Sequence, residues 1–240
     1  MRRLVPPMSS RIEPSDPRQG LPSGPVLVLA AHPGDELVGC GGTLALHAGQ
    51  GDRVHVVIVF DGAGSARGAD AREALAQRRR GESLAAGKHL GLERYEFWDY
   101  PEGREPTPEE LFFGARLLAQ KLAELEPRTL YLPWQGEQGH DQRVLAQGTQ
   151  LALEMAGRDV LVLGCELWTP LPATRLVDIS SVSERKRAAL RELRSLPGQR
   201  DLSQLALGLS AQRSAWLPAP ARYAEAFVPF AAAVHERGAA

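Results

Sequence analysis

The chain has 240 residues, of which 43% are hydrophobic, and it carries a formal net charge of −1. This length and apolar content predict one substantial core, and the near-neutral charge gives no reason to expect a nucleic acid or an anionic membrane as a partner. The apolar runs are too short to span a bilayer and no signal-peptide h-region is visible, so we expect a cytoplasmic location. The two cysteines, Cys40 and Cys165, lack CxxC spacing, which favours reduced core thiols over a zinc ribbon or a redox pair.

The first 24 residues are rich in Pro, Ser, Gly and Arg and show no hydrophobic period. This composition predicts a disordered or loosely attached tail over 1–24, followed by one domain over 25–240.

The domain begins with an apolar run over 26–31, which predicts a buried parallel strand. The run ends at His32, and Pro33-Gly34 signals a turn before a helix expected over 43–50. Open α/β sheets place their ligands at the carboxyl ends of such strands. The imidazole of His32 and the carboxylate of Asp35 are suitable zinc ligands. In the alternative interpretation, Asp35 caps the next helix and His32 is only packed.

The rest of the chain alternates apolar runs with helical patterns. Further strands are expected over 53–60, 92–98, 128–133, 160–168 and 174–179, and further helices over 69–90, 107–126, 183–195, 202–213 and 221–234. The segment 134–146 leads into one more helix. This alternation with short links predicts a Rossmann-like α/β fold, a doubly wound, mainly parallel sheet with helices on both faces. We expect His47 and His55 to be solvated, and the Arg cluster at 78–80 to form a solvated helix face.

Two motifs resemble those of the LmbE-like, or PIG-L, N-deacetylases. The first is His32-Pro33-Gly34-Asp35-Glu36, followed by Gly39-Cys40-Gly41-Gly42, where the usual family form is His-Pro-Asp-Asp-Glu before a glycine cluster. The second is the segment 137–143, which aligns without a gap to the family's Glu-x-His-Pro-Asp-His-Arg. The resemblance implies the family's fold and makes His32 and Asp35 metal ligands.

The resemblance also identifies three replaced groups, so the active-site motif is degenerate. The family's general base is Gly34 here, a catalytic histidine is Gly139, and the distal zinc-ligand histidine is Gln142. Gln142 or His140 is then the third metal ligand beside His32 and Asp35. Loss of a general base typically lowers a rate by about 10²- to 10⁴-fold.

By resemblance the protein is a zinc-dependent N-acetylglucosaminyl deacetylase that hydrolyses the acetamide of N-acetylglucosamine-type sugars or conjugates. The candidate catalytic residues are Asp141 and His140, with Glu36 as another substitute for the base. The candidate substrate-binding residues are Arg79, Asp61 and Asp99. Because the base and the distal ligand are replaced, the alternative is a catalytically impaired pseudoenzyme that binds a sugar or a protein partner.

Overall fold

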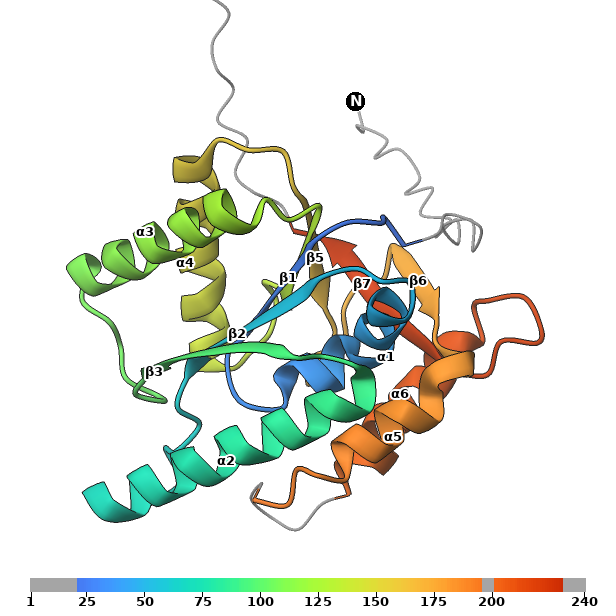
Figure 1. The fold of residues 1–240 in the computed structure, drawn as a ribbon, viewed down its shortest axis with the longest axis horizontal. Coiled ribbons are helices and arrows are strands. Elements are labelled where there is room, and N and C mark those ends of the chain that lie inside the picture. Colours follow the sequence, from blue (N-terminus) through green and yellow to red (C-terminus); the bar gives the residue numbers. More distant parts are fainter. Residues whose placement is uncertain (1–20, 196–200, 231–240) are drawn as a thin grey trace, which may run out of the picture.

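The computed structural model describes residues 21–195 and 201–230. Most of the tail expected over 1–24 therefore lies outside the described residues. Within the described part, seven strands form one sheet in the order β3-β2-β1-β4-β5-β7-β6 (Figure 1). They are β1 (Val26–Ala30), β2 (Val54–Phe60), β3 (Arg94–Tyr100), β4 (Thr129–Pro133), β5 (Leu161–Cys165), β6 (Arg175–Asp178) and β7 (Ala224–Pro229).

Strands β1 to β5 pair in parallel, whereas β7 runs antiparallel to both β5 and β6. The chain builds outward from β1 to β3 on one side and then returns to place β4 on the other side of β1. The point between β1 and β4 is therefore the place where the strand order reverses. The predicted doubly wound, mainly parallel α/β sheet is confirmed.

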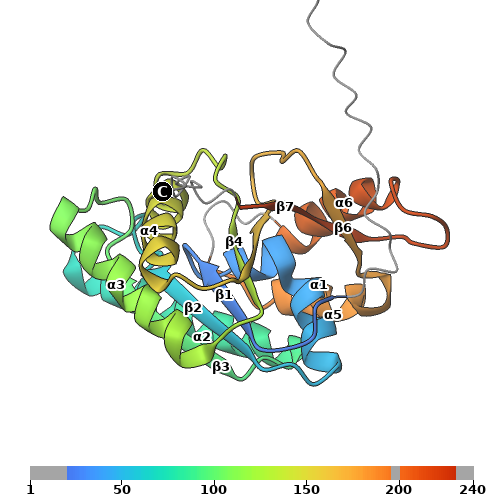
Figure 2. The ribbon, with the colours of Figure 1, turned by 90° about the horizontal axis from the view of Figure 1, so that it is seen from above.

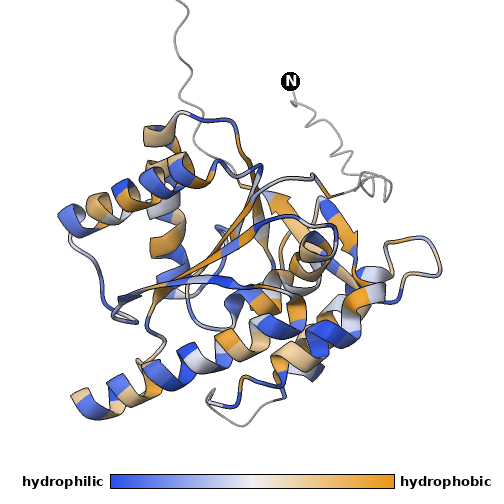
Figure 3. Cartoon of the chain, in the orientation of Figure 1, coloured by the Kyte–Doolittle hydropathy of each residue, from blue (hydrophilic) through white to orange (hydrophobic). Residues whose placement is uncertain are grey.

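Helices cover both faces of this sheet (Figure 2). They are α1 (Asp35–Gly49), α2 (Ala69–Leu90), α3 (Pro108–Leu125), α4 (His140–Ala156), α5 (Ser183–Leu190) and α6 (Leu202–Ser214), with a short 3-10 helix η1 (Ser180–Val182). Apolar side chains of α1, α2, α5 and α6 belong to the core on one face, and those of α3 and α4 to the core on the other. In Figure 3 the central strands are mostly hydrophobic and the edge strand β3 is mostly hydrophilic, while the helices carry both hydrophilic and hydrophobic patches. No helix among the described residues is long and apolar enough to cross a membrane.

Helix α1 begins at Asp35, eight positions before the expected start at residue 43. The glycine cluster lowers helix propensity, which explains the expectation. In the folded chain these glycines permit close packing instead. A Cβ at Gly39 would lie 2.8 Å from a Leu167 methyl carbon, and a Cβ at Gly42 would lie 2.8 Å from Ile179. Tertiary packing therefore determines where this helix begins.

The helix expected over 221–234 is wrong within its described part, because Ala224–Pro229 forms strand β7. Its alanine and glutamate residues favour a helix by propensity, but the segment pairs with β5 and β6. Glu225 also anchors it from inside the fold. Its carboxylate accepts the backbone N–H groups of Gly42 and Thr43 at 2.7 Å each, and pairs with Lys186 Nζ at 2.7 Å. These contacts outweigh the local preference.

His47 is buried, so the expectation that it is solvated is wrong. Its Nδ1 lies 2.7 Å from Asp52 Oδ2 and its Nε2 lies 3.0 Å from the Tyr131 hydroxyl. Both ring nitrogens are thus satisfied inside the fold. His55 is half-buried and lies 3.3 Å from Glu96 Oε2. The cysteines Cys40 and Cys165 are both free and buried, as expected.

Candidate active site

The candidate site lies at the carboxyl ends of β1 and β4, where the strand order reverses. His32 follows β1, and Gly34 then turns the chain into α1 with a φ of 107°. Asp35 is the first residue of α1. Asp141 and Gln142 lie in the first turn of α4, which follows the loop after β4. Open α/β sheets bind ligands at this reversal point, because the loops of two neighbouring strands diverge there.

The imidazole of His32 lies between two carboxylates. Its Nε2 is 2.7 Å from Asp141 Oδ2, and its Nδ1 is 3.6 Å from Asp35 Oδ2. Asp141 is itself fixed, because its two oxygens accept the Gly103 backbone N–H at 3.1 and 3.0 Å. Burial lowers the pKa of His32, but the hydrogen bonds to Asp141 and Asp35 outweigh it and raise the pKa to about 10. A metal ion at this ring must displace a proton.

Gln142 completes this group with its side-chain amide. The Nε2 atom donates a hydrogen bond to Asp35 Oδ2 at 3.1 Å and lies 3.4 Å from His32 Nδ1. Of the expected metal ligands, His32, Asp35 and Gln142 therefore lie together. At this point Gln142 presents a hydrogen-bond donor. His140, the alternative third ligand, lies beside Glu105 instead.

A pocket of about 180 Å³ opens beside these residues. Its lining includes His32, Asp35, Arg79, Glu102, Trp168 and Leu202. Trp168 is 55% exposed, so the pocket has an accessible aromatic side chain together with charged groups of both signs. A pocket of this composition can bind a polar ligand that also has an apolar face.

Arg79 is buried, which corrects the expectation that the whole Arg cluster is a solvated face. Its guanidinium donates to the Gly62 carbonyl oxygen, and its Nη1 lies 3.9 Å from Glu102 Oε2. Glu102 Oε2 also accepts the Gly64 backbone N–H at 2.6 Å. One ligand atom each of His32, Glu102 and Asp141 lie within 4.8 Å of one another, and His32 Nε2 and Asp141 Oδ2 are hydrogen-bonded to each other.

Glu102 is a pocket residue that is not among the candidate site residues from the sequence. The signal for it is the loop after the third strand, which also contains the candidate Asp99. In the structure Asp99 has a φ of 55° and forms an ion pair with Arg80. Asp61 Oδ1 accepts the backbone N–H groups of Ala63 at 2.9 Å and Glu102 at 3.1 Å, so it connects two loops. Neither aspartate is among the residues that line the pocket, and their substrate roles stay predictions.

The other candidate catalytic groups lie around the same centre. Asp141 contacts the His32 ring directly, whereas His140 Nε2 lies 3.5 Å from Glu105 Oε2 and 3.9 Å from Asp141 Oδ1. Glu36 is buried, and its Oε2 accepts the Gly34 backbone N–H at 2.9 Å. Burial raises the pKa of Glu36 to about 8. The catalytic roles of Asp141 and His140 stay predictions.

A buried carboxylate fixes the loop that carries Trp168. Glu137 Oε1 accepts three successive backbone N–H groups, from Leu167 at 3.0 Å, Trp168 at 3.2 Å and Thr169 at 3.3 Å. The segment after β4 therefore positions the segment after β5. This arrangement holds the aromatic side chain beside the pocket.

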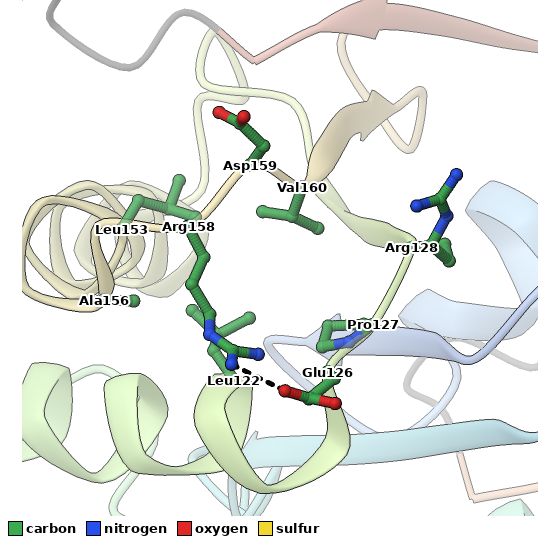
Figure 4. A pocket seen from close by; sticks show the side chains of 9 residues that line it. All are labelled: Leu122, Glu126, Pro127, Arg128, Leu153, Ala156, Arg158, Asp159 and Val160. Carbon is green, nitrogen blue, oxygen red and sulfur yellow. Dashed lines mark hydrogen bonds and ion pairs between the residues drawn. The ribbon is translucent and has the colours of Figure 1, made fainter.

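A larger cavity lies elsewhere in the fold. It has a volume of about 350 Å³, and an ion pair of 2.6 Å between Arg158 and Glu126 lies across it (Figure 4). Its lining includes Arg128 and Val160, which directly precede β4 and β5. It is therefore at the amino ends of these strands, the edge of the sheet opposite to His32, and it contains none of the candidate site residues.

The sequence comparison decides the family. The model of the PIG-L family, described as GlcNAc-PI de-N-acetylase, matches residues 27–153, which is more than half of the chain. The chain belongs to this family. The matched range contains both halves of the candidate site, from His32 to Gln142. No curated protein matches the chain.

Solved structures support the fold. GalB, the 4-carboxy-2-hydroxymuconate hydratase of Pseudomonas putida, is 24% identical with a TM-score of 0.72, over 90% of this chain and 100% of that one. The conserved protein TT1542 of Thermus thermophilus is 24% identical with a TM-score of 0.73, over 90% and 98%. The N,N'-diacetylchitobiose deacetylase of Pyrococcus horikoshii is 21% identical with a TM-score of 0.66, over 85% and 82%.

The donor atoms fit a divalent metal ion at two of three positions. His32 Nδ1 and Asp35 Oδ2 lie close together, and an imidazole nitrogen with a carboxylate oxygen is a suitable pair for zinc. At the third position the Gln142 NH₂ group is a donor only, so the amide can ligate only through its oxygen, Oε1. A neutral amide oxygen suits calcium or magnesium better than zinc. His32 and Asp35 therefore suit a divalent metal ion, and Gln142 offers only a weak third ligand.

Proposed function

We propose that this protein is a zinc-dependent N-deacetylase of N-acylated amino sugars or their conjugates, with a weakened metal site. The observation that supports this proposal is the position of the His32 ring between Asp141 and Asp35 at the end of β1. A metal-ligating histidine commonly donates its second ring N–H to a carboxylate, which fixes the ring and its tautomer. Asp141 is in the position to do this for His32.

His32 and Asp35 would hold the metal, with Gln142 as the third ligand. A bound zinc ion would polarise the amide carbonyl and lower the pKa of a bound water molecule. Asp141 orients the His32 ring, and its own position is fixed by the Gly103 N–H. The carboxylates that line the pocket are Asp35 and Glu102. Asp35 would be a metal ligand and Asp141 is hydrogen-bonded to His32, so we propose Glu102 as the carboxylate that accepts a proton during hydrolysis.

The walls of the pocket favour a sugar as the substrate. The exposed indole of Trp168 offers an aromatic face against which the C–H groups of a pyranose ring can pack. Arg79 and Glu102 supply charged hydrogen-bonding groups on the lining of the same pocket. The fold alone does not select this reaction, because GalB shares it and is named a hydratase.

Turnover is expected to be slow, because Gly34 has no side chain at the family's base position and the proposed substitute, Glu102, is already engaged by the Gly64 N–H and by Arg79. Loss of a general base lowers a rate by about 10²- to 10⁴-fold. Relative to an ordinary enzyme with a kcat near 10 s⁻¹, we expect acetate release at about 0.1 s⁻¹ or less.

The test is acetate release from N-acetylglucosamine and its conjugates by the zinc-supplemented protein. The unmodified protein should release acetate slowly but faster than His32→Ala. Glu102→Gln should lower kcat by about 10²-fold, whereas Glu109→Gln on the exposed start of α3 should leave it unchanged. Acetate release that is equal in the unmodified protein and in His32→Ala contradicts the proposal. Sugar binding without any acetate release would instead support the binding-only pseudoenzyme.

A further inference from the structure

The side-chain amide of Gln142 lies beside both groups that would hold the ion in the proposed metal site. Gln142 is 5% exposed, and its Nε2 donates to Asp35 Oδ2 at 3.1 Å while lying 3.4 Å from His32 Nδ1. These two atoms are the ones that would hold the ion. We propose that the Gln142 amide takes the place of the metal, so that this site stays ordered and hydrogen-bonded without an ion. This inference rests on the proposed function, since it concerns the same ligands.

Gly139 makes this position of the amide sterically accessible. A Cβ at Gly139 would lie 1.9 Å from Gln142 Oε1 and 2.8 Å from its Cδ. Any larger residue at position 139 would therefore push the amide away from Asp35. The φ of Gly139 is −61°, so its backbone does not itself require glycine. The Gln142 amide occupies the space that a side chain at position 139 would fill. The replacements at positions 139 and 142 of the second motif therefore depend on each other.

The hydrogen bond to the amide satisfies a carboxylate that is only 7% exposed, at the wall of the pocket. Asp35 is buried, and besides the amide its Oδ2 accepts the His32 backbone N–H at 3.2 Å. Removing one partner of a buried charged hydrogen bond leaves that charge unsatisfied and destabilises the fold. In a site made for a metal, the ion supplies this stabilisation and chelators remove it. Here the Gln142 amide supplies this stabilisation of Asp35, so the stability of the protein becomes independent of metal. An incoming ion must first displace the amide.

The experiment compares thermal unfolding in excess chelator and with zinc equimolar to the protein. The unmodified protein should unfold at the same temperature, within about 1 °C, under both conditions. Gln142→Ala should unfold about 3–8 °C lower in chelator. Gln147→Ala on the exposed face of the same helix should shift by less than about 1 °C. A chelator-dependent midpoint for the unmodified protein, or an unshifted midpoint for Gln142→Ala in chelator, overturns the proposal.

A double-mutant cycle tests the role of Gly139. Gly139→Ala should lower the midpoint in chelator when Gln142 is present, because its methyl group displaces the amide. In the Gln142→Ala background the same change should have little effect. Equal shifts of the midpoint in both backgrounds overturn the proposal, because additive effects mean that the two residues are not coupled.

Gln142→His separates this inference from the proposed function. It removes the amide and restores a zinc ligand, so its midpoint should fall in chelator and recover with equimolar zinc. A midpoint that does not fall in chelator overturns the role of the amide. A midpoint that falls in chelator but does not recover with zinc supports the role of the amide and contradicts the proposed zinc site.

Discussion

Gly34 shows how a single residue limits the chemistry of the site. Its φ of 107° lies in a region that L-amino acids rarely adopt, and a Cβ there would lie 2.9 Å from Leu193 Cδ1. An aspartate at this position would therefore strain the backbone and require the Leu193 side chain to shift. The sequence reveals that the base is missing, but it does not reveal the strain that a side chain would meet here.

Restoring the base consequently requires more than one substitution. Gly34→Asp alone should destabilise the protein by about 1–3 kcal/mol through backbone strain and leave acetate release unchanged. Gly34→Asp combined with Gln142→His and Leu193→Ala should bind zinc more tightly and raise turnover by at least about 10-fold. Urea unfolding and acetate release measure the two effects. A large gain in turnover from Gly34→Asp alone would show that an aspartate fits at this position.

At the scale of elements, local sequence patterns predicted most of the fold. The Thr107–Glu110 capping box is present at the start of α3, because both of its hydrogen bonds lie within four residues. The start of α1 and the strand β7 depend on packing against segments that are distant in the sequence. Helix and strand propensities describe only local preferences and do not reveal such packing. The convergence of residues near 32–35 with those near 139–142 followed from the family motifs and the reversal point. Three features could not be predicted in this way, because each depends on a specific tertiary contact. They are the orientation of the Gln142 amide, the burial of Arg79 and the position of Glu102.

The two loops after β4 and β5 should act as one unit in substrate binding. Trp168→Ala should raise KM for an N-acetylated sugar by about 3- to 10-fold, the loss of one aromatic contact, while kcat changes little. Glu137→Gln should have a similar but smaller effect, because an amide replaces the carboxylate that accepts three backbone N–H groups. Trp216→Ala, which removes an equally exposed indole outside the pocket lining, is the control. An unchanged KM for Trp168→Ala would exclude its role in binding.

For the molecule as a whole, the buried contact of His47 with Asp52 and Tyr131 makes stability depend on pH. Burial lowers the pKa of His47, although the hydrogen bond to Asp52 opposes the shift. Below the ordinary pKa of about 6.5 the unfolded chain therefore binds more protons at this residue than the folded chain. Its contribution to stability is fully present above that value and is lost as the pH falls.

Replacing His47 should remove this contribution. The free energy of unfolding of the unmodified protein should fall between pH 7 and pH 5, and His47→Gln should make this fall smaller. His89→Gln, which changes an exposed histidine, should leave the fall as it is. Urea unfolding at pH 5, 6, 7 and 8 measures the difference. A steeper fall for His47→Gln would contradict the sign of the pKa shift.

The affinity for zinc, measured by competition with a chromophoric chelator, tests the central claim most directly. The unmodified protein should bind one zinc ion at least about 100-fold more weakly than Gln142→His, because its third ligand is an amide that first has to leave Asp35. His32→Ala should abolish binding in both backgrounds. Stoichiometric zinc that survives dialysis of the unmodified protein against a strong chelator, or unchanged metal content in His32→Ala, would contradict the account.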